Sequence, residues 1–326
     1  MRRKRKKQIL ILAISLSLCL GLLLNEILRG EDTGRIYNIS IITRGKNSES
    51  LMIMKEGIDQ AALEMNANIS FVTLSEDNSV DEQNDLIKRE MNNGADAILI
   101  SPVDYEKMSE AVDNAASKLP VVQIESKVNS NRILPIISCD NFQLGASLGE
   151  EVIKMGGSNN KIAIVKNNLE CSSIKERYDG FMDAIKNTNN EYTLLDITGY
   201  KQGDYYRQVR DFLDNNNVDA IVTFDTAMLE SVGQAKKDMS TANNQYSNIQ
   251  IYGTGSTSKI ISFLEEKVVN ATAMQNEFNV GYIGVKTAVS MINKKKIDDS
   301  VIYSTVVNSD NMYSNENQRL LFPFVR

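Results

Sequence analysis

The sequence predicts an α/β protein with two similar lobes, each a parallel sheet covered by helices, preceded by a membrane-crossing segment. Short apolar runs alternate with segments of helical period, this alternation starts again after Asp140, and a basic cluster with an uncharged apolar run opens the chain. A strand, helix, strand order gives a parallel sheet with helices on both faces. The length of 326 residues also suits two lobes better than one core.

The expected elements of the two halves follow the same order. In the first half we expect strands at 36–42, 69–74, 97–100, 121–124 and 136–138, and helices at 51–65, 81–92 and 107–117. In the second half we expect strands at 161–165, 193–197, 220–224 and 249–252, and helices at 174–186, 206–215, 227–237 and 256–266, with Ser256 as a helix cap. No Pro-rich or Gly/Ser-rich linker separates the halves, so short crossings are expected to act as a hinge.

A tripeptide supports a repeated α/β unit. Asp96-Ala97-Ile98 follows an amphipathic helix, and Asp219-Ala220-Ile221 follows another in the second half. An internal repeat accounts for this economically, and chance recurrence of a common tripeptide is the alternative.

Residues 1–30 are predicted to be a cytoplasmic basic tail and a membrane anchor or signal segment. Six consecutive basic residues, 2–7, precede an uncharged apolar run at 9–24, and the positive-inside bias places the rest of the chain outside the cytoplasm. No small-x-small cleavage site follows the run, which favours retention of the anchor over removal. Cys19 invites a lipoprotein interpretation, but Leu18 precedes it where a small residue is usual, so a cysteine within the bilayer is preferred.

Composition excludes several classes of function. The chain has no histidine, which rules out Ser-His-Asp and Cys-His nucleophiles and histidine zinc sites, so we expect no enzyme, cofactor or metal. Of 36 basic and 42 acidic side chains, seven basic and one acidic lie in residues 1–30, and the remaining net charge of −12 makes nucleic acid an unexpected partner. Cys139 and Cys171 do not make a disulfide framework, although one bridge between them stays open.

A set of short motifs follows one another in order along residues 35–326. They are Lys55-Glu56-Gly57-Ile58, Gly94-Ala95-Asp96-Ala97-Ile98, Ser101-Pro102-Val103-Asp104, Leu119-Pro120-Val121-Val122, Asp140-Asn141, Gly145, Glu176-Arg177 and Gly180-Phe181. In this order and spacing they resemble the ribose-type periplasmic binding proteins. The lactose-repressor group shares this body but carries a DNA-reading helix-turn-helix where this chain has its membrane segment.

This resemblance implies two Rossmann-like lobes joined by a three-crossing hinge, with a small polar ligand held between them. The N-terminal lobe would comprise 35–138 plus 276–304, and the C-terminal lobe 139–275 plus 305–326. Residues 277–292 would be a first-lobe helix, and a last strand around 320–325 would complete the second lobe. The residues themselves agree, because ligands of open parallel sheets lie beyond the carboxyl ends of the strands.

Polar residues at these strand ends are the candidate ligand contacts. Carboxylate, guanidinium and amide groups each engage two neighbouring hydroxyls, which suits them to sugars. The resemblance and the strand ends nominate Arg44, Asn47, Ser48, Glu125, Asp140, Arg177, Asp225 and Gln275. The competing interpretations are a surface salt bridge from Arg177 to Glu176 or Asp179, a helix cap for Asp225, which is compatible with binding, and a hinge hydrogen bond for Asp140.

Several positions depart from the family pattern. Glu125 stands where an aspartate is usual, Ser126 where the ribose binder has arginine, and Thr254 where it has aspartate. No aromatic residue occurs in 44–54, where family members stack rings on the sugar, and Leu51 occupies the expected place. Other loops could supply a ring from Tyr105, Phe142, Tyr200 or Tyr205. A different pentose or hexose, a polyol, or a solute with a carboxylate paired to Arg44 or Arg177 therefore stays open.

The expected function is that of an extracytoplasmic, membrane-tethered solute-binding protein. Its lobes would close on a small polar ligand, a sugar by preference, and deliver it to the permease of an ABC-type importer. The alternative is a ligand-sensing partner of a membrane histidine kinase or receptor.

Overall fold

The computed structural model describes residues 35–45, 48–199, 202–297 and 301–321. The predicted membrane segment, its cleavage and the lipidation of Cys19 therefore lie outside the described residues. In the ranges that are described, no helix combines the length and the apolar character that crossing a membrane requires.

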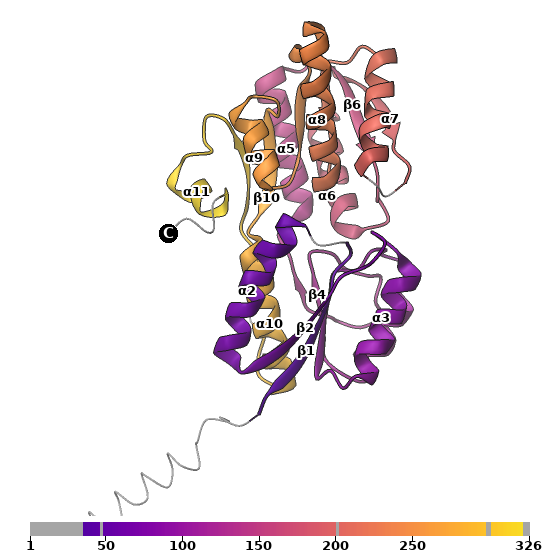
Figure 1. Cartoon of the computed structure of the whole chain (residues 1–326), viewed down its shortest axis with the longest axis vertical. Helices are drawn as coiled ribbons and strands as arrows, with labels where there is room; N and C mark the ends of the chain where they lie inside the picture. The colour runs from indigo at the N-terminus through magenta and orange to yellow at the C-terminus, as the bar shows by residue number, and fades with distance from the viewer. Residues whose placement is uncertain (1–34, 46–47, 200–201, 298–300, 322–326) are drawn as a thin grey trace, which may run out of the picture. The chain divides into compact units, whose positions relative to one another are not determined.

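The first lobe is built on a five-stranded parallel sheet in the order β2-β1-β3-β4-β5 (Figure 1). Its strands are β1 (Tyr37–Ile42), β2 (Ala67–Val72), β3 (Ala97–Ile100), β4 (Val121–Ile124) and β5 (Ile136–Ile137). Its helices are α2 (Glu49–Met65), α3 (Val80–Asn92), α4 (Ser109–Ala116) and α10 (Glu277–Ile292). In Figure 1, α2 and α10 lie together on one side of the sheet and α3 lies on the other, so both faces are covered as predicted.

The second lobe is built on a six-stranded sheet in the order β11-β10-β9-β8-β6-β7. Its strands are β6 (Lys161–Lys166), β7 (Glu191–Asp196), β8 (Ala220–Val222), β9 (Gln250–Thr254), β10 (Ala271–Gln275) and β11 (Ser304–Asn308). Its helices are α5 (Asn141–Gly156), α6 (Ser172–Ile185), α7 (Gln202–Asn215), α8 (Thr226–Ala242), the 3-10 helix η1 (Asn244–Asn248), α9 (Ser258–Glu265) and α11 (Asn315–Leu321). Only β11 runs antiparallel to its neighbour in this sheet.

Two predicted features of the second lobe are wrong. The last strand among the described residues is β11. Leu320 and Leu321, with which the predicted strand 320–325 would begin, instead bury their side chains from the helix α11, and 322–325 lie outside the described residues. A short apolar run cannot tell a strand from a buried helix by its periodicity, whereas the β-branched residues 305–307 favour a strand. The cap of α9 is Thr257, whose hydroxyl accepts from the Ile260 amide, one residue after the predicted Ser256.

The repeated Asp-Ala-Ile tripeptide has the same structural role in both lobes. The Asp96 carboxylate accepts a hydrogen bond from the Asn38 amide at 2.9 Å, and the Asp219 carboxylate accepts one from the Lys161 amide at 2.8 Å. Each aspartate precedes an inner strand, β3 or β8, and joins it to the beginning of the neighbouring strand, β1 or β6. The internal repeat therefore reflects one sheet-forming unit used twice.

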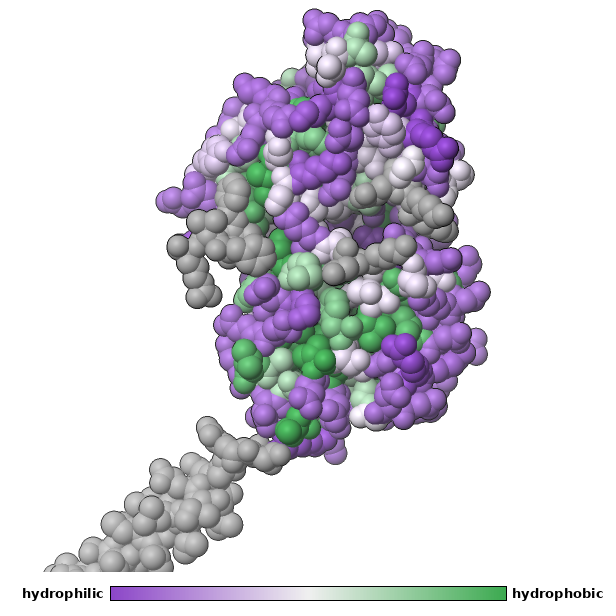
Figure 2. Space-filling view, viewed as in Figure 1, coloured by the Kyte–Doolittle hydropathy of each residue, from purple (hydrophilic) through white to green (hydrophobic). Residues whose placement is uncertain are grey.

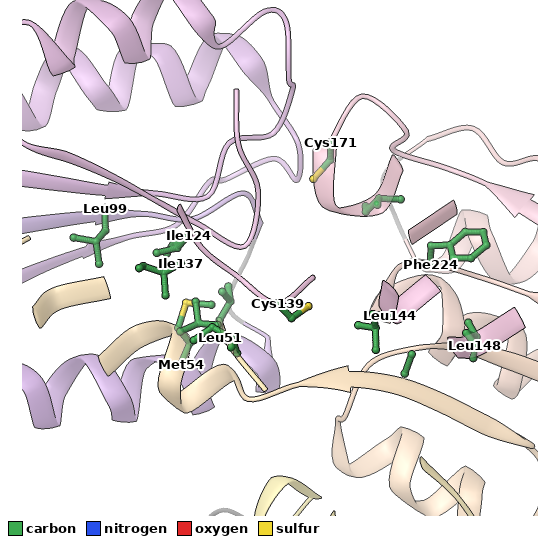
Figure 3. Packing of buried hydrophobic residues seen from close by; sticks show 14 of the residues in the cluster. Leu51, Met54, Leu99, Ile124, Ile137, Cys139, Leu144, Leu148, Cys171 and Phe224 are labelled. Atoms are coloured by element: carbon green, nitrogen blue, oxygen red, sulfur yellow. The ribbon is translucent and has the colours of Figure 1, made fainter. Parts of the chain in front are cut away.

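Apolar side chains fill both lobes and continue through the segment that connects them. Figure 3 shows Leu99, Ile124 and Ile137 in the first lobe, Leu144 and Leu148 in the second, and Cys139 between the two groups. The chain crosses from one lobe to the other in three places, between β5 and α5, between β10 and α10, and between α10 and β11. The two sheets are thereby joined by a common set of crossings.

The edge strand β2 is the least covered strand of the first sheet. Its residues alternate between exposed and half-buried, with Ile69 and Phe71 packed against the core. Figure 2 shows apolar side chains at the surface where β1 and β2 lie, whereas the helices of the second lobe present a largely hydrophilic surface in the same view.

Glycines let α5 and α6 touch backbone to backbone. A Cβ atom on Gly145 would lie 2.0 Å from the Arg177 carbonyl oxygen, and one on Gly180 would lie 1.9 Å from the Phe142 carbonyl oxygen. No side chain fits in either place, because these separations are far below van der Waals contact. The close approach fixes the position of α6, and with it the position of Arg177.

We predict that Gly180→Ala lowers the free energy of unfolding by about 1–3 kcal/mol or more, because α6 must move away from the Phe142 carbonyl. Thermal unfolding followed by circular dichroism measures this. Gly203→Ala in α7 is the matched control, since a Cβ there meets nothing within 4 Å and alanine favours the helix. Equal melting temperatures for the two variants would contradict the prediction.

Candidate ligand-binding site

A cavity of about 550 Å³ is lined by residues of both lobes at the carboxyl ends of their strands. Arg44 follows β1, Glu125 follows β4, Asn168 follows β6, Asp225 follows β8, and Glu277 follows β10. This volume lies in the range of about 300–1,000 Å³ that is usual for small-molecule sites. The cavity therefore occupies the place where open α/β sheets bind ligands.

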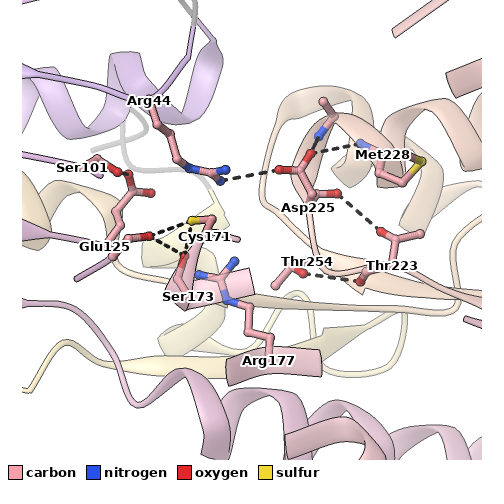
Figure 4. Close-up of polar contacts among 12 residues, drawn as sticks. Arg44, Ser101, Glu125, Cys171, Ser173, Arg177, Thr223, Asp225, Met228 and Thr254 are labelled. Atoms are coloured by element: carbon pink, nitrogen blue, oxygen red, sulfur yellow. Dashed lines mark hydrogen bonds and ion pairs between the residues drawn. The ribbon is translucent and has the colours of Figure 1, made fainter. Parts of the chain in front are cut away.

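Arg44 and Asp225 face each other across the cavity (Figure 4). The distance between Arg44 Nη2 and Asp225 Oδ2 is 3.5 Å. Burial alone would lower the pKa of Arg44, but the nearby Cys171 thiol and the carboxyls of Asp225, Glu125 and Glu277 outweigh it and raise this pKa above its ordinary value. The guanidinium is therefore a permanent positive charge in the cavity wall.

Asp225 also caps α8, so it has the second role that the sequence allowed. Its Oδ1 accepts from the backbone amides of Ala227 at 3.0 Å and Met228 at 3.3 Å, while Oδ2 faces Arg44. The first turn of α8 thus holds the carboxylate in a fixed direction.

The two roles of Asp225 are separable by substitution. We predict that Asp225→Asn keeps the helix cap but loses the charge facing Arg44, and that Asp225→Ala loses both, with about 1 kcal/mol of further destabilisation. Chemical unfolding of the two variants measures the difference. Identical stabilities would show that the cap contributes nothing.

Glu125 has a strained backbone at the end of β4. Its φ angle is +59°, in the left-handed region that residues other than glycine seldom adopt. Ser101 Oγ donates to Glu125 Oε2 at 2.9 Å, and Ser138 Oγ donates to the Glu125 carbonyl oxygen at 2.9 Å. These contacts hold the side chain toward the cavity from the first-lobe side.

Arg177 points inward from the first turns of α6 and is 8% exposed. Its Nε donates to Asn141 Oδ1 at 2.7 Å. The alternative of a surface salt bridge is wrong for the described residues, because Glu176 pairs with Lys127 at 2.6 Å and Asp179 pairs with Lys175 at 2.5 Å. The guanidinium is thus held at the cavity by a buried amide instead of by an acidic neighbour.

Of the other predicted ligand contacts, two do not line the cavity and one lies outside the described residues. Asp140 caps α5 by accepting from the Gln143 amide at 2.9 Å, and it lines a second cavity of about 560 Å³ beside the crossing segments. Gln275 is buried at the end of β10, where its Oε1 accepts from the Cys139 amide at 3.3 Å. Asn47 lies outside the described residues, whereas Ser48 lines the cavity and caps α2.

Glu277 also lines the cavity, although its sequence position did not mark it as a ligand contact. Its Oε1 accepts from Gln275 Nε2 at 3.2 Å, while its buried Oε2 has no hydrogen-bond partner among the described residues. Burial and the neighbouring Glu125 raise the pKa of Glu277 to about 8, against the opposing effects of Gln275, Arg177 and Arg44. The sequence shows only that Glu277 is an acidic residue two positions after Gln275, in the first turn of a helix. Sequence position alone does not reveal that its carboxyl oxygen is buried.

Other polar groups also reach the cavity. The side chains of Glu49, Asp77, Asn78, Glu230 and Thr257 line it, and Tyr205 supplies one of the aromatic rings expected from the loops. Tyr105 and Phe142 do not line this cavity, and Tyr200 lies outside the described residues. Leu51 lines it from α2, in the place where an aromatic ring was expected.

The described cysteines are both free and buried, so the bridge that the sequence left open between Cys139 and Cys171 is absent. Cys171 and Ser173 instead contact Ser126, whose Oγ lies 3.0 Å from Cys171 Sγ and 2.8 Å from Ser173 Oγ. Burial raises the pKa of the Cys139 thiol, which favours its neutral form.

The comparison with known protein families decides the classification. Residues 39–296 match the family described as periplasmic binding protein domain. The chain belongs to the periplasmic binding protein family. This confirms the resemblance that the motifs indicated.

Individual members of the family are distant in sequence but similar in fold. The ribose import binding protein RbsB of Bacillus subtilis strain 168 is 20% identical over 268 residues, which cover 81% of this chain and 85% of that protein. A carbohydrate transporter solute binding protein from Agrobacterium radiobacter, solved in complex with D-arabinose, is 20% identical with a TM-score of 0.81, covering 88% of this chain and 99% of that one. The XylFII–LytSN complex contains a chain that is 23% identical with a TM-score of 0.75, covering 85% and 99%.

Proposed function

We propose that this member of the periplasmic binding protein family is an extracytoplasmic, membrane-tethered protein that closes on a small polar ligand, a sugar by preference, for an ABC-type importer. The moving parts would be the lobes 35–138 plus 276–304 and 139–275 plus 305–326. Support comes from the family membership and from relatives named for ribose import and carbohydrate transport.

The observation that carries this proposal is the pair of arginines in a cavity lined by both lobes. Arg44 comes from the first lobe and Arg177 from the second, and each guanidinium offers several donors in a planar fork. A ligand that bonds to both forks at once binds the closed arrangement better than the open one. Such differential affinity shifts the hinge equilibrium toward closure.

A screen of pentoses, hexoses, polyols and amino acids tests ligand binding. Thermal unfolding of the full-length protein, in a detergent without a sugar headgroup, is expected to move to higher temperature with at least one neutral sugar or polyol. Calorimetry then gives the affinity of each hit. If every compound in the screen leaves the transition unchanged, the proposed function is wrong.

Membrane tethering is a separate part of the proposal. It is supported by the basic cluster at 2–7 and the apolar run at 9–24. The full-length chain is expected to stay with the membrane fraction after an alkaline carbonate wash, and external protease is expected to digest its folded part. If the wash released the folded part of the protein into the supernatant, a retained anchor would be contradicted.

A sensing role is the second candidate. It is supported by the similarity to the chain in the XylFII–LytSN complex, because that structure carries a partner bound to a protein of this fold. Deletion of the neighbouring permease is expected to stop growth on the ligand if the protein serves transport. Continued growth, with loss of ligand-induced transcription when this protein is deleted, would favour sensing.

A further inference from the structure

Acidic side chains outnumber basic ones in the lining of the cavity. Two arginines, Arg44 and Arg177, face six carboxyl groups, and no lysine lines the cavity in the described ranges. The six are Glu49, Asp77, Glu125, Asp225, Glu230 and Glu277. A cavity with this excess of negative groups favours a positively charged ligand over a neutral or anionic one.

Several of these carboxylates already have partners within the protein. Asp225 caps α8 and faces Arg44, Glu230 accepts from Thr257 Oγ1 at 2.6 Å, and Glu49 accepts from the Ser258 amide at 2.8 Å and from its hydroxyl. These groups organise the walls of the cavity. A ligand charge is therefore better placed near a carboxyl group whose oxygens are not already satisfied.

Glu277 and Glu125 form such a place on the first-lobe wall. Glu277 Oε2 is buried without a hydrogen-bond partner among the described residues, and Glu125 accepts one side-chain hydrogen bond there, from Ser101. A buried carboxyl oxygen without a donor is destabilising, and a native structure retains one where a ligand or another group completes it. When Glu277 is ionised, the group that completes this oxygen must be a hydrogen-bond donor.

We propose that the ligand is an amino sugar, a small polyhydroxylated amine whose ammonium group lies between Glu125 and Glu277. An ammonium group has three donors and no acceptor, so it can satisfy both carboxyl groups while its charge offsets part of the negative excess. Arg44 and Arg177 would then engage the hydroxyl oxygens. This proposal rests on the proposed function, because it names the ligand class of the same cavity.

Proton release on binding is a distinctive consequence. The charged and titratable groups that face Glu277 are Glu125, Arg44, Arg177 and Cys139, and burial, these groups and the hydrogen bond from Gln275 leave its pKa at about 8. Glu277 therefore carries a proton below pH 7. An arriving ammonium ion lowers this pKa, so the carboxyl proton passes to the buffer as the ion pair forms. A neutral sugar offers no such charge.

Calorimetry of the full-length protein at pH 6.5 tests the proposal with matched triplets. Each triplet contains a neutral hexose, its 2-amino-2-deoxy analogue and the N-acetylated analogue, built on glucose, galactose and mannose. In at least one triplet the amine is expected to bind at least about tenfold more tightly than both uncharged forms. Its apparent enthalpy is expected to differ between phosphate and imidazole buffers, which reports the released proton.

Variants locate the effect. Glu277→Gln keeps the shape of the side chain and is expected to remove both the preference for the amine and the buffer dependence. Glu110→Gln is the matched control, because Glu110 is also an acidic residue in a first helical turn but is exposed and outside the cavity. It is expected to behave like the unaltered protein.

The remaining outcomes separate this proposal from the proposed function. Uncharged sugars that bind as tightly as their amines overturn the amino-sugar proposal and leave sugar binding in place. A preference for the amine that survives in Glu277→Gln overturns the assigned position. If no triplet binds, the amino-sugar proposal fails, and the neutral pentoses and polyols of the general screen decide the proposed function independently.

Discussion

Arg177→Ala is expected to weaken ligand binding by on the order of 2–5 kcal/mol, about 30-fold to several thousand-fold in Kd. The substitution removes a planar charged fork that α6 holds at the cavity, and no other arginine of the second lobe lines that cavity in the described ranges. Calorimetry with a hit from the ligand screen measures the loss. Unchanged affinity would remove Arg177 from the site.

Stability must be measured beside affinity in this experiment. The Arg177 guanidinium also satisfies the buried Asn141 side chain, so its loss is expected to cost about 1–2 kcal/mol of folding free energy while unfolding stays cooperative. Lys175→Ala is the matched control on the same helix, since Lys175 is exposed and pairs with Asp179 at 2.5 Å. That variant is expected to keep both affinity and fold.

Glu277→Gln is expected to change how the stability of the empty protein depends on pH. The pKa of Glu277 is raised from 4.5 to about 8, so the folded state binds its proton more tightly than the unfolded state does. The resulting stabilisation is fully present below about pH 4.5 and is lost as the pH rises through 8. The unaltered protein should therefore lose on the order of 3 kcal/mol relative to the variant between these pH values.

Thermal unfolding at pH 5, 7 and 9 measures this difference. The melting temperature of Glu277→Gln is expected to exceed that of the unaltered protein increasingly toward pH 9, whereas Glu110→Gln should follow the unaltered protein at each pH. A constant offset across the three pH values would mean that Glu277 titrates at its ordinary pKa. The prediction concerns the protein without ligand, so it holds whichever ligand binds.

The fold was largely predictable because its signals are local. The alternation of short apolar strands with amphipathic helices depends on residues a few positions apart, and it placed β1, β3 and β4 almost to the residue. The repeated aspartates Asp96 and Asp219 indicated the two similar sheets for the same reason. The predicted position of the last strand was wrong because the short apolar run at 320–325 has no period that distinguishes a strand from a helix. Whether a segment forms an edge strand also depends on its packing against the neighbouring strand, which for β11 is β10.

The residues of the candidate site also differ in how far local sequence signals predict them. The sequence by itself indicated that Arg44 and Glu125 would lie together, because the carboxyl ends of parallel strands share one edge of a sheet, whereas the place of Asp225 opposite them, at the end of a strand of the other sheet, was only implied by the family resemblance. Only the tertiary structure decided that Gln275 accepts from the Cys139 amide, that Asp140 caps α5, and that a carboxyl oxygen of Glu277 is buried near Glu125. The physical reason is that burial and charge are produced by segments far apart in the sequence, and no local pattern records which of them will lie against a given side chain.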